Sequence, residues 1–335
     1  MAMRWGLIGA STIAAEHVIG AIRAQKDNAI SAVLSSSRER ADAYAARHAI
    51  PNADTELAVL LARPEIDAVY ISTTNEKHRD QALAAIAAGK HVLCEKPLAM
   101  SVADARRMVD AARKAGLVFA TNHHLRCSGA HRAAKALIAG GRIGKVLSMR
   151  VFHAVLLPEH LRGWRLDNPA AGGGVIPDIT VHDADTVRFY LDEDPKRVVA
   201  QAVSSGLGQG VEDSVMSVWT MPSGVMVQSH ESFTHPFAGS GLEIHGTEGS
   251  IFARNVMTQL PTGTITLVTA EGEADVPYES YNLYEYAIAA FNRAVSGEGR
   301  PAADGIDGVK SLAIAMAVRQ SAREGRAIDV DYEGY

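Results

Sequence analysis

Three acid–base side chains stand at helical spacing near the middle of the chain. Asp178, His182 and Asp185 fall at positions i, i+4 and i+7, so on a helix they would share one face. A carboxylate beside a histidine can set its tautomer and hold it protonated as a proton donor. The alternative is a polar, capped helix start behind the glycines at 172–174. A metal site is disfavoured because no third histidine stands at ligand spacing.

The turn at residues 9–14, Gly-Ala-Ser-Thr-Ile-Ala, follows a short apolar segment near the N-terminus. It occupies the place of the dinucleotide fingerprint G-x-G-x-x-G/A, in which small residues let the backbone approach a pyrophosphate. Only one of its three fingerprint positions is glycine, so an ordinary strand–turn–helix is the alternative. A helix N-terminus beyond the turn would offer N–H groups to phosphate.

The second strand is expected to end at Ser35, followed by Ser36, Ser37 and two arginines, Arg38 and Arg40. An NAD-specific fold places a carboxylate at this point for the ribose 2′-hydroxyl. Hydroxyl donors and guanidinium groups suit a 2′-phosphate instead. The pattern therefore favours NADP(H), with a serine-capped, solvated helix start as the alternative.

Two polar segments, 72–78 and 94–97, each follow a short apolar run. Both are expected at the carboxyl edge of a parallel sheet, where ligands bind. Lys96 could there donate a hydrogen bond to a substrate oxygen and stabilise a developing alkoxide. The alternative for a single lysine is a solvated surface position.

The first 120 residues alternate between strand and helix patterns, which predicts βαβ units and a parallel sheet buried on both faces. Strands are predicted at 4–8, 30–34, 68–72, 91–94 and 118–121, and helices at 12–25, 38–48, 55–61, 77–88 and 102–114.

Beyond about residue 150 the pattern changes to strands joined by short turns, which must pair antiparallel. We therefore predict an α/β protein with a Rossmann domain at 1–121 and a second domain at 122–335, built on a mostly antiparallel sheet. Strands are predicted at 146–155, 198–203, 214–220, 224–230, 241–245, 250–253 and 264–268, and closing helices at 283–295 and 309–323.

Composition limits the class of protein. The chain has 335 residues, 47% hydrophobic and 21% charged, which is typical of a globular protein. Its net charge of −5, without a basic run, argues against a nucleic-acid or anionic-membrane partner. The apolar stretch near the N-terminus is interrupted and has no A-x-A site, so we expect no signal peptide. Two cysteines form no disulfide framework, which favours a reducing cytoplasm.

Taken together, the strings IGAS, CEKP and GGG followed by DITVHDAD make the sequence similar to the glucose–fructose oxidoreductase/inositol dehydrogenase (Gfo/Idh/MocA) family. This resemblance covers essentially the whole chain. It implies an N-terminal Rossmann domain and a C-terminal α/β domain with a large, open, mostly antiparallel sheet. It also implies a cis peptide bond between Lys96 and Pro97.

The resemblance implies the following site residues. Catalytic positions are Lys96, Asp178 and His182. We also expect substrate contacts at Lys96, His153, Trp164, Asp178 and His182, with a hydrogen-bonded structural role as the alternative for His153 and a core position as the alternative for Trp164. Cofactor contacts are Gly9, Ala10, Ser11, Thr12, Ile13, Ser35, Ser36, Arg40, Thr73, Thr74, Asn75, Glu76, Lys77, His78, Glu95, Lys96, Asn122, Trp164, Arg165 and Tyr284. Ser11 and Ala14 depart from the commoner glycines.

The expected activity is the reduction of a small sugar ketone with NADPH. His182 is the preferred proton donor, Lys96 would polarise the carbonyl, and Asp178 would orient the donor; Lys96 and His182 could exchange roles. The alternatives are an NAD(P)-linked polyol or inositol dehydrogenase and a sugar-sensing regulator that binds NADP without turnover. The oligomeric state is open between a monomer and a homodimer through the large sheet. In a monomer the outer face of that sheet should be mostly polar.

Overall fold

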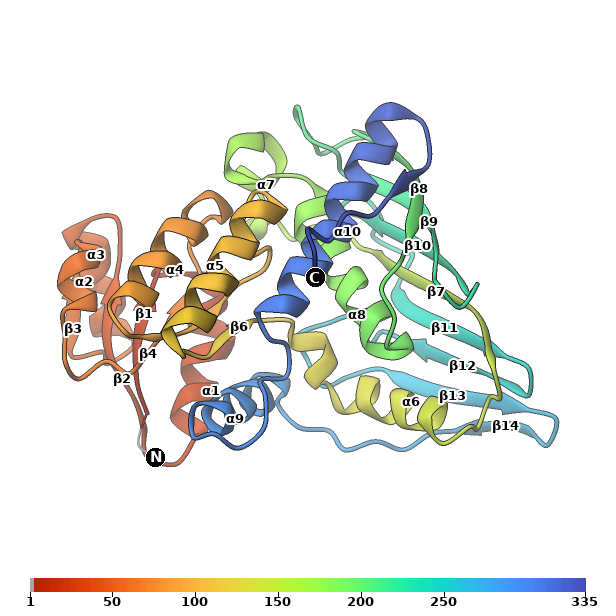
Figure 1. Cartoon of the computed structure of the whole chain (residues 1–335), viewed down its shortest axis with the longest axis horizontal. Helices are drawn as coiled ribbons and strands as arrows, with labels where there is room; N and C mark the ends of the chain where they lie inside the picture. The colour runs from red at the N-terminus through yellow and green to blue at the C-terminus, as the bar shows by residue number, and fades with distance from the viewer. Residues whose placement is uncertain (1–2) are drawn as a thin grey trace. The chain divides into compact units, whose positions relative to one another are not determined.

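The computed structural model describes residues 3–335 (Figure 1). Contacts divide the chain into two compact units: residues up to 124 together with 284–309, and residues 125–283 together with 310–335. The domain limits 1–121 and 122–335 stay a prediction. The structure adds that residues 284–309, at the end of the chain predicted as second domain, have their contacts in the first unit.

The first unit contains the predicted parallel sheet, in the strand order β3-β2-β1-β4-β5-β6. All four residues of β4 are buried, so both faces of the sheet are covered. The order reverses between β1 and β4, which places the segments after these two strands side by side. The strands are β1 Met3–Ile8, β2 Asn28–Leu34, β3 Asn52–Asp54, β4 Ala68–Ile71, β5 His91–Cys94 and β6 Phe119–Thr121.

The helices of this unit follow the predicted pattern closely. The first one begins as a π-helical turn, Ala14–Val18, before α1. Ser37 caps α2, with its side chain accepting a hydrogen bond from the Arg40 backbone N–H. The helices are α1 Ile19–Ala24, α2 Arg38–Arg47, α3 Leu57–Leu61, α4 His78–Ala87, α5 Val102–Ala115, α9 Leu283–Val295 and the start of α10 Gly305–Glu324.

The second unit contains the predicted mostly antiparallel sheet, ordered β14-β13-β12-β11-β7-β10-β9-β8-β15. Within residues 3–335, only the central pair β7–β10 of this sheet is parallel. Both parts of the predicted fold class are thus confirmed. The strands are β7 Val146–Ala154, β8 Arg197–Val203, β9 Ser214–Thr220, β10 Met226–Ser232, β11 Ser240–Gly246, β12 Gly249–Arg254, β13 Thr264–Thr269, β14 Gly272–Asp275 and β15 Ile328–Asp329.

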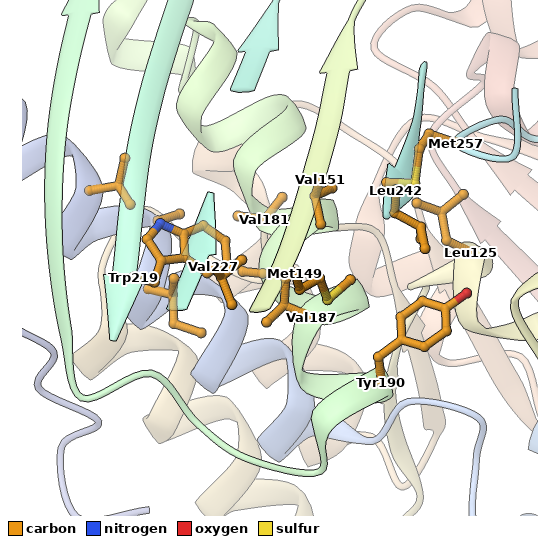
Figure 2. Packing of buried hydrophobic residues seen from close by; sticks show 14 of the residues in the cluster. Leu125, Met149, Val151, Val181, Val187, Tyr190, Trp219, Val227, Leu242 and Met257 are labelled. Atoms are coloured by element: carbon orange, nitrogen blue, oxygen red, sulfur yellow. The ribbon is translucent and has the colours of Figure 1, made fainter. Parts of the chain in front are cut away.

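One face of this sheet is buried under helices. Its core side chains alternate along the strands, because successive residues point to opposite faces. Figure 2 shows Met149 and Val151 of β7, Val227 of β10 and Trp219 of β9 on the same side as Val187 of α8. The helices of the unit are α6 Gly129–Ala139, which the sequence analysis missed, α7 Trp164–Asp167, α8 Val181–Leu191 and α10 from residue 310 onward.

The outer face of β8, β9 and β10 is mixed. Gln201 and Gln228 lie there beside exposed Val199, Met216 and Val218. This face of the sheet therefore combines polar side chains with exposed apolar ones. No helix within residues 3–335 is both long and apolar enough to cross a bilayer.

Candidate active site

The turn after β1 approaches the segment after β4 closely. Gly9 has φ +117°, and a Cβ there would lie 3.1 Å from the backbone carbonyl of Ser72. Only glycine accepts both this conformation and this approach. The hydroxyls of Ser11 and Ser72 lie 2.7 Å apart, and Ser11 Oγ accepts a hydrogen bond from the Ala14 N–H. Ser11 therefore holds the turn in the place where a glycine is commoner.

The end of β2 carries the predicted hydroxyl and guanidinium groups. Ser35 is buried, and its N–H donates to Asp54 O of β3. Ser36 is exposed. The Arg40 guanidinium donates to Ala10 O at 2.9 Å, which brings a positive charge from α2 to the first turn. Arg38, in contrast, donates to Ala53 O at 2.6 Å.

His78 connects the two segments that follow β4 and β5. Its Nδ1 lies 2.8 Å from Pro97 O and its Nε2 lies 3.1 Å from Thr73 O. Burial lowers the pKa of His78, although both carbonyls oppose that shift. The Lys96–Pro97 peptide bond is cis, as predicted. Lys96 is the second residue after β5 and is half-buried.

Glu95 is held on its carboxylate by two donors. Asn122 Nδ2 donates to Glu95 Oε1 at 2.6 Å, and the Tyr70 hydroxyl donates to the same oxygen. Burial, and then the neighbouring Glu95 charge, raise the pKa of Tyr70, so it remains a donor. Asn122 reaches this position because its backbone N–H also pairs with Cys94 O.

The remaining cofactor candidates of this unit surround the same sheet edge. The Tyr284 ring is buried and stacks on His17 and His124, with ring centroids 4.8 and 5.2 Å away. Thr73 and Thr74 donate to Gln81 and Glu76 through their hydroxyls. The short 3₁₀ helix Asn75–Lys77 follows them. The first unit therefore gathers its predicted residues at the carboxyl ends of β1, β2, β4, β5 and β6.

In the second unit, glycines bring three segments into contact before α8. A Cβ on Gly173 would lie 2.6 Å from Trp164 O. A Cβ on Gly174, which has φ +110°, would lie 2.6 Å from Glu212 Oε1. The chain then forms a π-helical turn, Ile176–Thr180, that runs into α8. Single π-helical turns within helices are frequent at functional sites.

Asp178 projects from this turn toward Arg165. Arg165 Nε donates to Asp178 Oδ2 at 3.2 Å, and its guanidinium lies 4.7 Å from the centre of the Trp164 ring. Trp164 and Arg165 were expected among the cofactor contacts. In this unit Arg165 also neutralises the carboxylate that was expected to orient the proton donor.

His182 is buried in the first turn of α8, and its ring centroid lies 6.4 Å from that of His153 on β7. Asp185, grouped with it by spacing, is part of the core. Arg126 Nε donates to Asp185 Oδ2 at 2.8 Å, and both side chains are almost completely buried. The carboxylate that spacing grouped with His182 thus forms a buried ion pair in the second unit.

Two carboxyl groups near His153 were missed by the sequence analysis. Asp183 lies beside His182 in the chain, and Glu231 lies on the buried face of β10. The sequence could have indicated Glu231, because it lies four residues after the buried Val227 and therefore on the same face of the strand. A carboxylate on the buried face of a strand is rare and usually has a partner. Within residues 3–335, no three His, Cys, Asp or Glu side chains form a group suited to a metal ion.

Comparison with known proteins places these two units in one family. Residues 3–123 match the family model described as an oxidoreductase family with an NAD-binding Rossmann fold, and residues 131–252 match the GFO/IDH/MocA C-terminal domain. The chain belongs to the GFO/IDH/MocA oxidoreductase family. Its expected resemblance and its class as an oxidoreductase are thus confirmed.

Among relatives of this family, the 1,5-anhydro-D-fructose reductase of Ensifer adhaerens is 58% identical over 98% of both chains. The myo-inositol 2-dehydrogenase of Thermotoga maritima is 28% identical over 98% of this chain and 99% of its own. The strings KHVLCEKPLAM, GWRL and HGTEGS in this sequence also resemble anhydrofructose reductases.

Solved structures of the family share the fold. An aldose–aldose oxidoreductase from Caulobacter crescentus, complexed with glycerol, superposes with a TM-score of 0.91 at 24% identity, covering 98% of this chain and 100% of its own. A levoglucosan dehydrogenase in complex with NADH and levoglucosan superposes with a TM-score of 0.88 at 23% identity, covering 98% and 99%. At these identities the likeness is one of fold.

Proposed function

We propose that this protein reduces 1,5-anhydro-D-fructose to 1,5-anhydro-D-mannitol with NADPH. The observation that carries the proposal is the 58% identity to a 1,5-anhydro-D-fructose reductase over nearly the full length of both chains. The presence of Lys96, Asp178 and His182 supports an enzyme over a sensor, since a sensor has no need of a proton donor.

The residues of the first unit fit a dinucleotide 2′-phosphate. Gly9 permits a backbone approach, the turn precedes a helix N-terminus, and Arg40 brings its guanidinium to that turn. Ser35 replaces the carboxylate that would repel a phosphate. The bound cofactor would supply the hydride for the carbonyl carbon. The proposed cofactor contacts are those expected from the sequence, at Gly9–Ile13, Ser35, Ser36, Arg40, residues 73–78, Glu95, Lys96, Asn122, Trp164, Arg165 and Tyr284.

The reduction also needs a polarised carbonyl and a proton. Lys96 would donate a hydrogen bond to the carbonyl oxygen and stabilise the charge that develops there. His182 would give its proton to the resulting alkoxide. Asp178 would orient this donor, with its charge balanced by Arg165 at 3.2 Å. His153 and Trp164 would contact the sugar. We place the reaction in the cytoplasm, which suits the buried thiols of Cys94 and Cys127.

Loss of NADPH absorbance on adding a ketose tests this function. The screen should include 1,5-anhydro-D-fructose, other dicarbonyl sugars and an inosose, each with NADPH and with NADH. We expect turnover of anhydrofructose with NADPH and loss of that turnover in Lys96→Met. Turnover of the inosose with NADH alone would favour the inositol dehydrogenase. NADPH binding without turnover of any sugar would favour the regulator.

A further inference from the structure

Two fully buried carboxyl groups of the second unit have no role in the proposed reaction. Asp183 and Glu231 both have no solvent-exposed surface. Glu231 continues the inward face of β10 after Val227 and Ser229, which are buried too. The inner, apolar face of the sheet thus becomes polar toward the end of this strand. A polar group in such a place is costly unless its hydrogen bonds are satisfied.

The register of the sheet brings His153 to these carboxyls. β10 and β7 pair in parallel, with Glu231 directly beside His153, so the two side chains share a face. Asp183 reaches the same place from the first turn of α8, and its Oδ1 lies 3.3 Å from His153 Nδ1. The side chain of His153 is 12% exposed, whereas that of Asp183 is not exposed at all. The imidazole therefore links buried carboxyls to the surface.

Two of the four carboxyl oxygens have a polar partner, and the other two are buried without one. Asp183 Oδ1 faces His153 Nδ1, and Glu231 Oε1 accepts a hydrogen bond from the Ser229 hydroxyl. The two carboxyl groups lie close enough for each to affect the pKa of the other. Among the described residues, Asp183 Oδ2 and Glu231 Oε2 have no hydrogen-bond partner. A carboxyl–carboxyl hydrogen bond needs one proton, because two carboxylates can only accept.

No lysine or arginine of residues 3–335 forms an ion pair with either carboxyl. Burial raises the pKa of both groups well above the usual range, and for Glu231 the neighbouring Asp183 adds to the shift. Adjacent carboxyls without a cation cannot both ionise, as in other dyads that share one proton.

We propose that Asp183 and Glu231 form a dyad with one shared proton that positions His153 and sets its tautomer. The dyad keeps the proton of the neutral imidazole on Nδ1, toward Asp183. Nε2 is then an acceptor for a hydroxyl group of the substrate. Asp183 and Glu231 are positioning residues that act through His153. The role of Nε2, though not the dyad itself, rests on the proposed reduction of a polyhydroxylated ketone.

The unmodified protein gives the first test. In ¹⁵N spectra of histidine-labelled protein without substrate at neutral pH, we expect a neutral His153 ring with its proton on Nδ1. The resonance is assigned by its absence from His153→Gln. An imidazolium, or a neutral ring protonated on Nε2, overturns the proposal. This measurement needs neither substrate nor turnover, so its result is independent of the proposed function.

Opposite shifts in two neutral variants give the second test. Glu231→Gln leaves a full negative charge on Asp183, so the pKa of His153 should rise by about one unit or more. Asp183→Asn removes the charge beside Nδ1, so the pKa of His153 should fall relative to that variant and to the parent. Glu243→Gln on β11, which removes the ion-pair partner of Arg150, is the matched control and should leave the pKa of His153 unchanged. Shifts of one sign in both variants overturn the dyad.

Other ionisable groups near His153 are His182, whose ring centroid is 6.4 Å away, and His131 on α6. Both are retained in all variants, so they do not explain opposite shifts. Both amide variants keep side-chain volume and add no charge to the buried site, so we expect them to fold. If either variant fails to fold, the tautomer of His153 in the unmodified protein still tests the proposal.

Kinetics separate positioning from a purely structural role. In Glu231→Gln the higher pKa of His153 favours its imidazolium form, whose Nε2 cannot accept a hydrogen bond from a sugar hydroxyl. The KM for the ketose should therefore rise about two- to tenfold, the range for the loss of one hydrogen bond. KM for NADPH should not change. Equal changes in both KM values would overturn the role of His153 Nε2.

Discussion

The two units assemble their candidate sites in different ways. In the first unit, Gly9 and Ser35 follow directly after a parallel strand, and Lys96 is the second residue after β5. In the second, His153, Asp183 and Glu231 come from a strand, a helix and another strand, with 30 to 48 residues between successive members. Parallel strands collect their carboxyl ends at one edge whatever the details of pairing. In the second sheet, where β7 and β10 form the central pair, a one-residue change in register would turn Glu231 or His153 to the opposite face.

Replacing His182 by alanine should have the largest effect and tests the second unit. A positioned acid contributes about 10²–10⁴-fold, so kcat should fall by that factor. NADPH binding, which we attribute mainly to the first unit, should change little. Steady-state kinetics measure kcat, and fluorescence titration measures NADPH binding. His245→Ala, on the outer face of the sheet, is the control and should change neither. A near-normal kcat in His182→Ala would mean that Lys96 or water, and not His182, donates the proton.

Asp185→Asn tests the buried ion pair that spacing alone had grouped with the site. Leaving Arg126 buried without its carboxylate should cost about 3–5 kcal/mol of unfolding free energy. The double variant Arg126→Met, Asp185→Leu should regain most of this loss. Urea unfolding measures both. Unchanged stability combined with a large loss of kcat would contradict the structural role.

The carboxylate of Asp213 in the second unit is bound by backbone N–H groups from the loop that precedes it, and this contact should make the stability of the protein depend on pH. Although burial acts to raise its pKa, N–H donors from Gly208, Ser205 and Leu207 lower it to about 2. A lowered folded-state pKa stabilises the protein above about pH 4 and loses this contribution as pH falls toward about 2. The contribution should be about 2–3 kcal/mol.

Unfolding free energies between pH 5 and pH 2 measure this contribution. In Asp213→Asn the corresponding part of the pH dependence should be absent, while activity at neutral pH is retained. Identical pH profiles of stability for the two proteins would refute the assignment.

Ser35→Asp should have the smallest effect and tests the first unit. A carboxylate at the end of β2 would repel a 2′-phosphate and accept a hydrogen bond from a 2′-hydroxyl. We expect the preference for NADPH over NADH to fall by at least about tenfold, equivalent to about 1.4 kcal/mol. Arg40 still favours phosphate, so a full reversal is not required. KM values for both cofactors measure it, with Ser35→Asn as the uncharged control.

A smaller change in that ratio would mean that Ser35 does not face the 2′ position. Phosphate recognition would then rest on Arg40, and the register inferred for β2 from the sequence would be in error.

How far the sequence predicts this molecule depends on the range of the contacts. Alternating strand and helix patterns predicted the parallel sheet, and turn chemistry predicted the antiparallel one. β3, with its polar Asn52–Asp54, was missed because it carries no marked apolar pattern, whereas α6 was missed although its apolar residues gather on one face. The spacing around His182 is compatible with α8, yet it could not assign the partner of Asp185, since Arg126 lies 59 residues away in the chain.

The sequence by itself determined the family, the two sheets and the polar residues that follow each parallel strand, because strand ends and turns depend on residues that are neighbours in the chain. Only the tertiary structure decided which buried charges meet. The contact of Asp183 with Glu231 and His153 depends on the register of β10 against β7 and on the angle of α8 beneath them. Burial then makes those contacts matter, because a charge removed from water must find a proton, a donor or an opposite charge in its immediate surroundings.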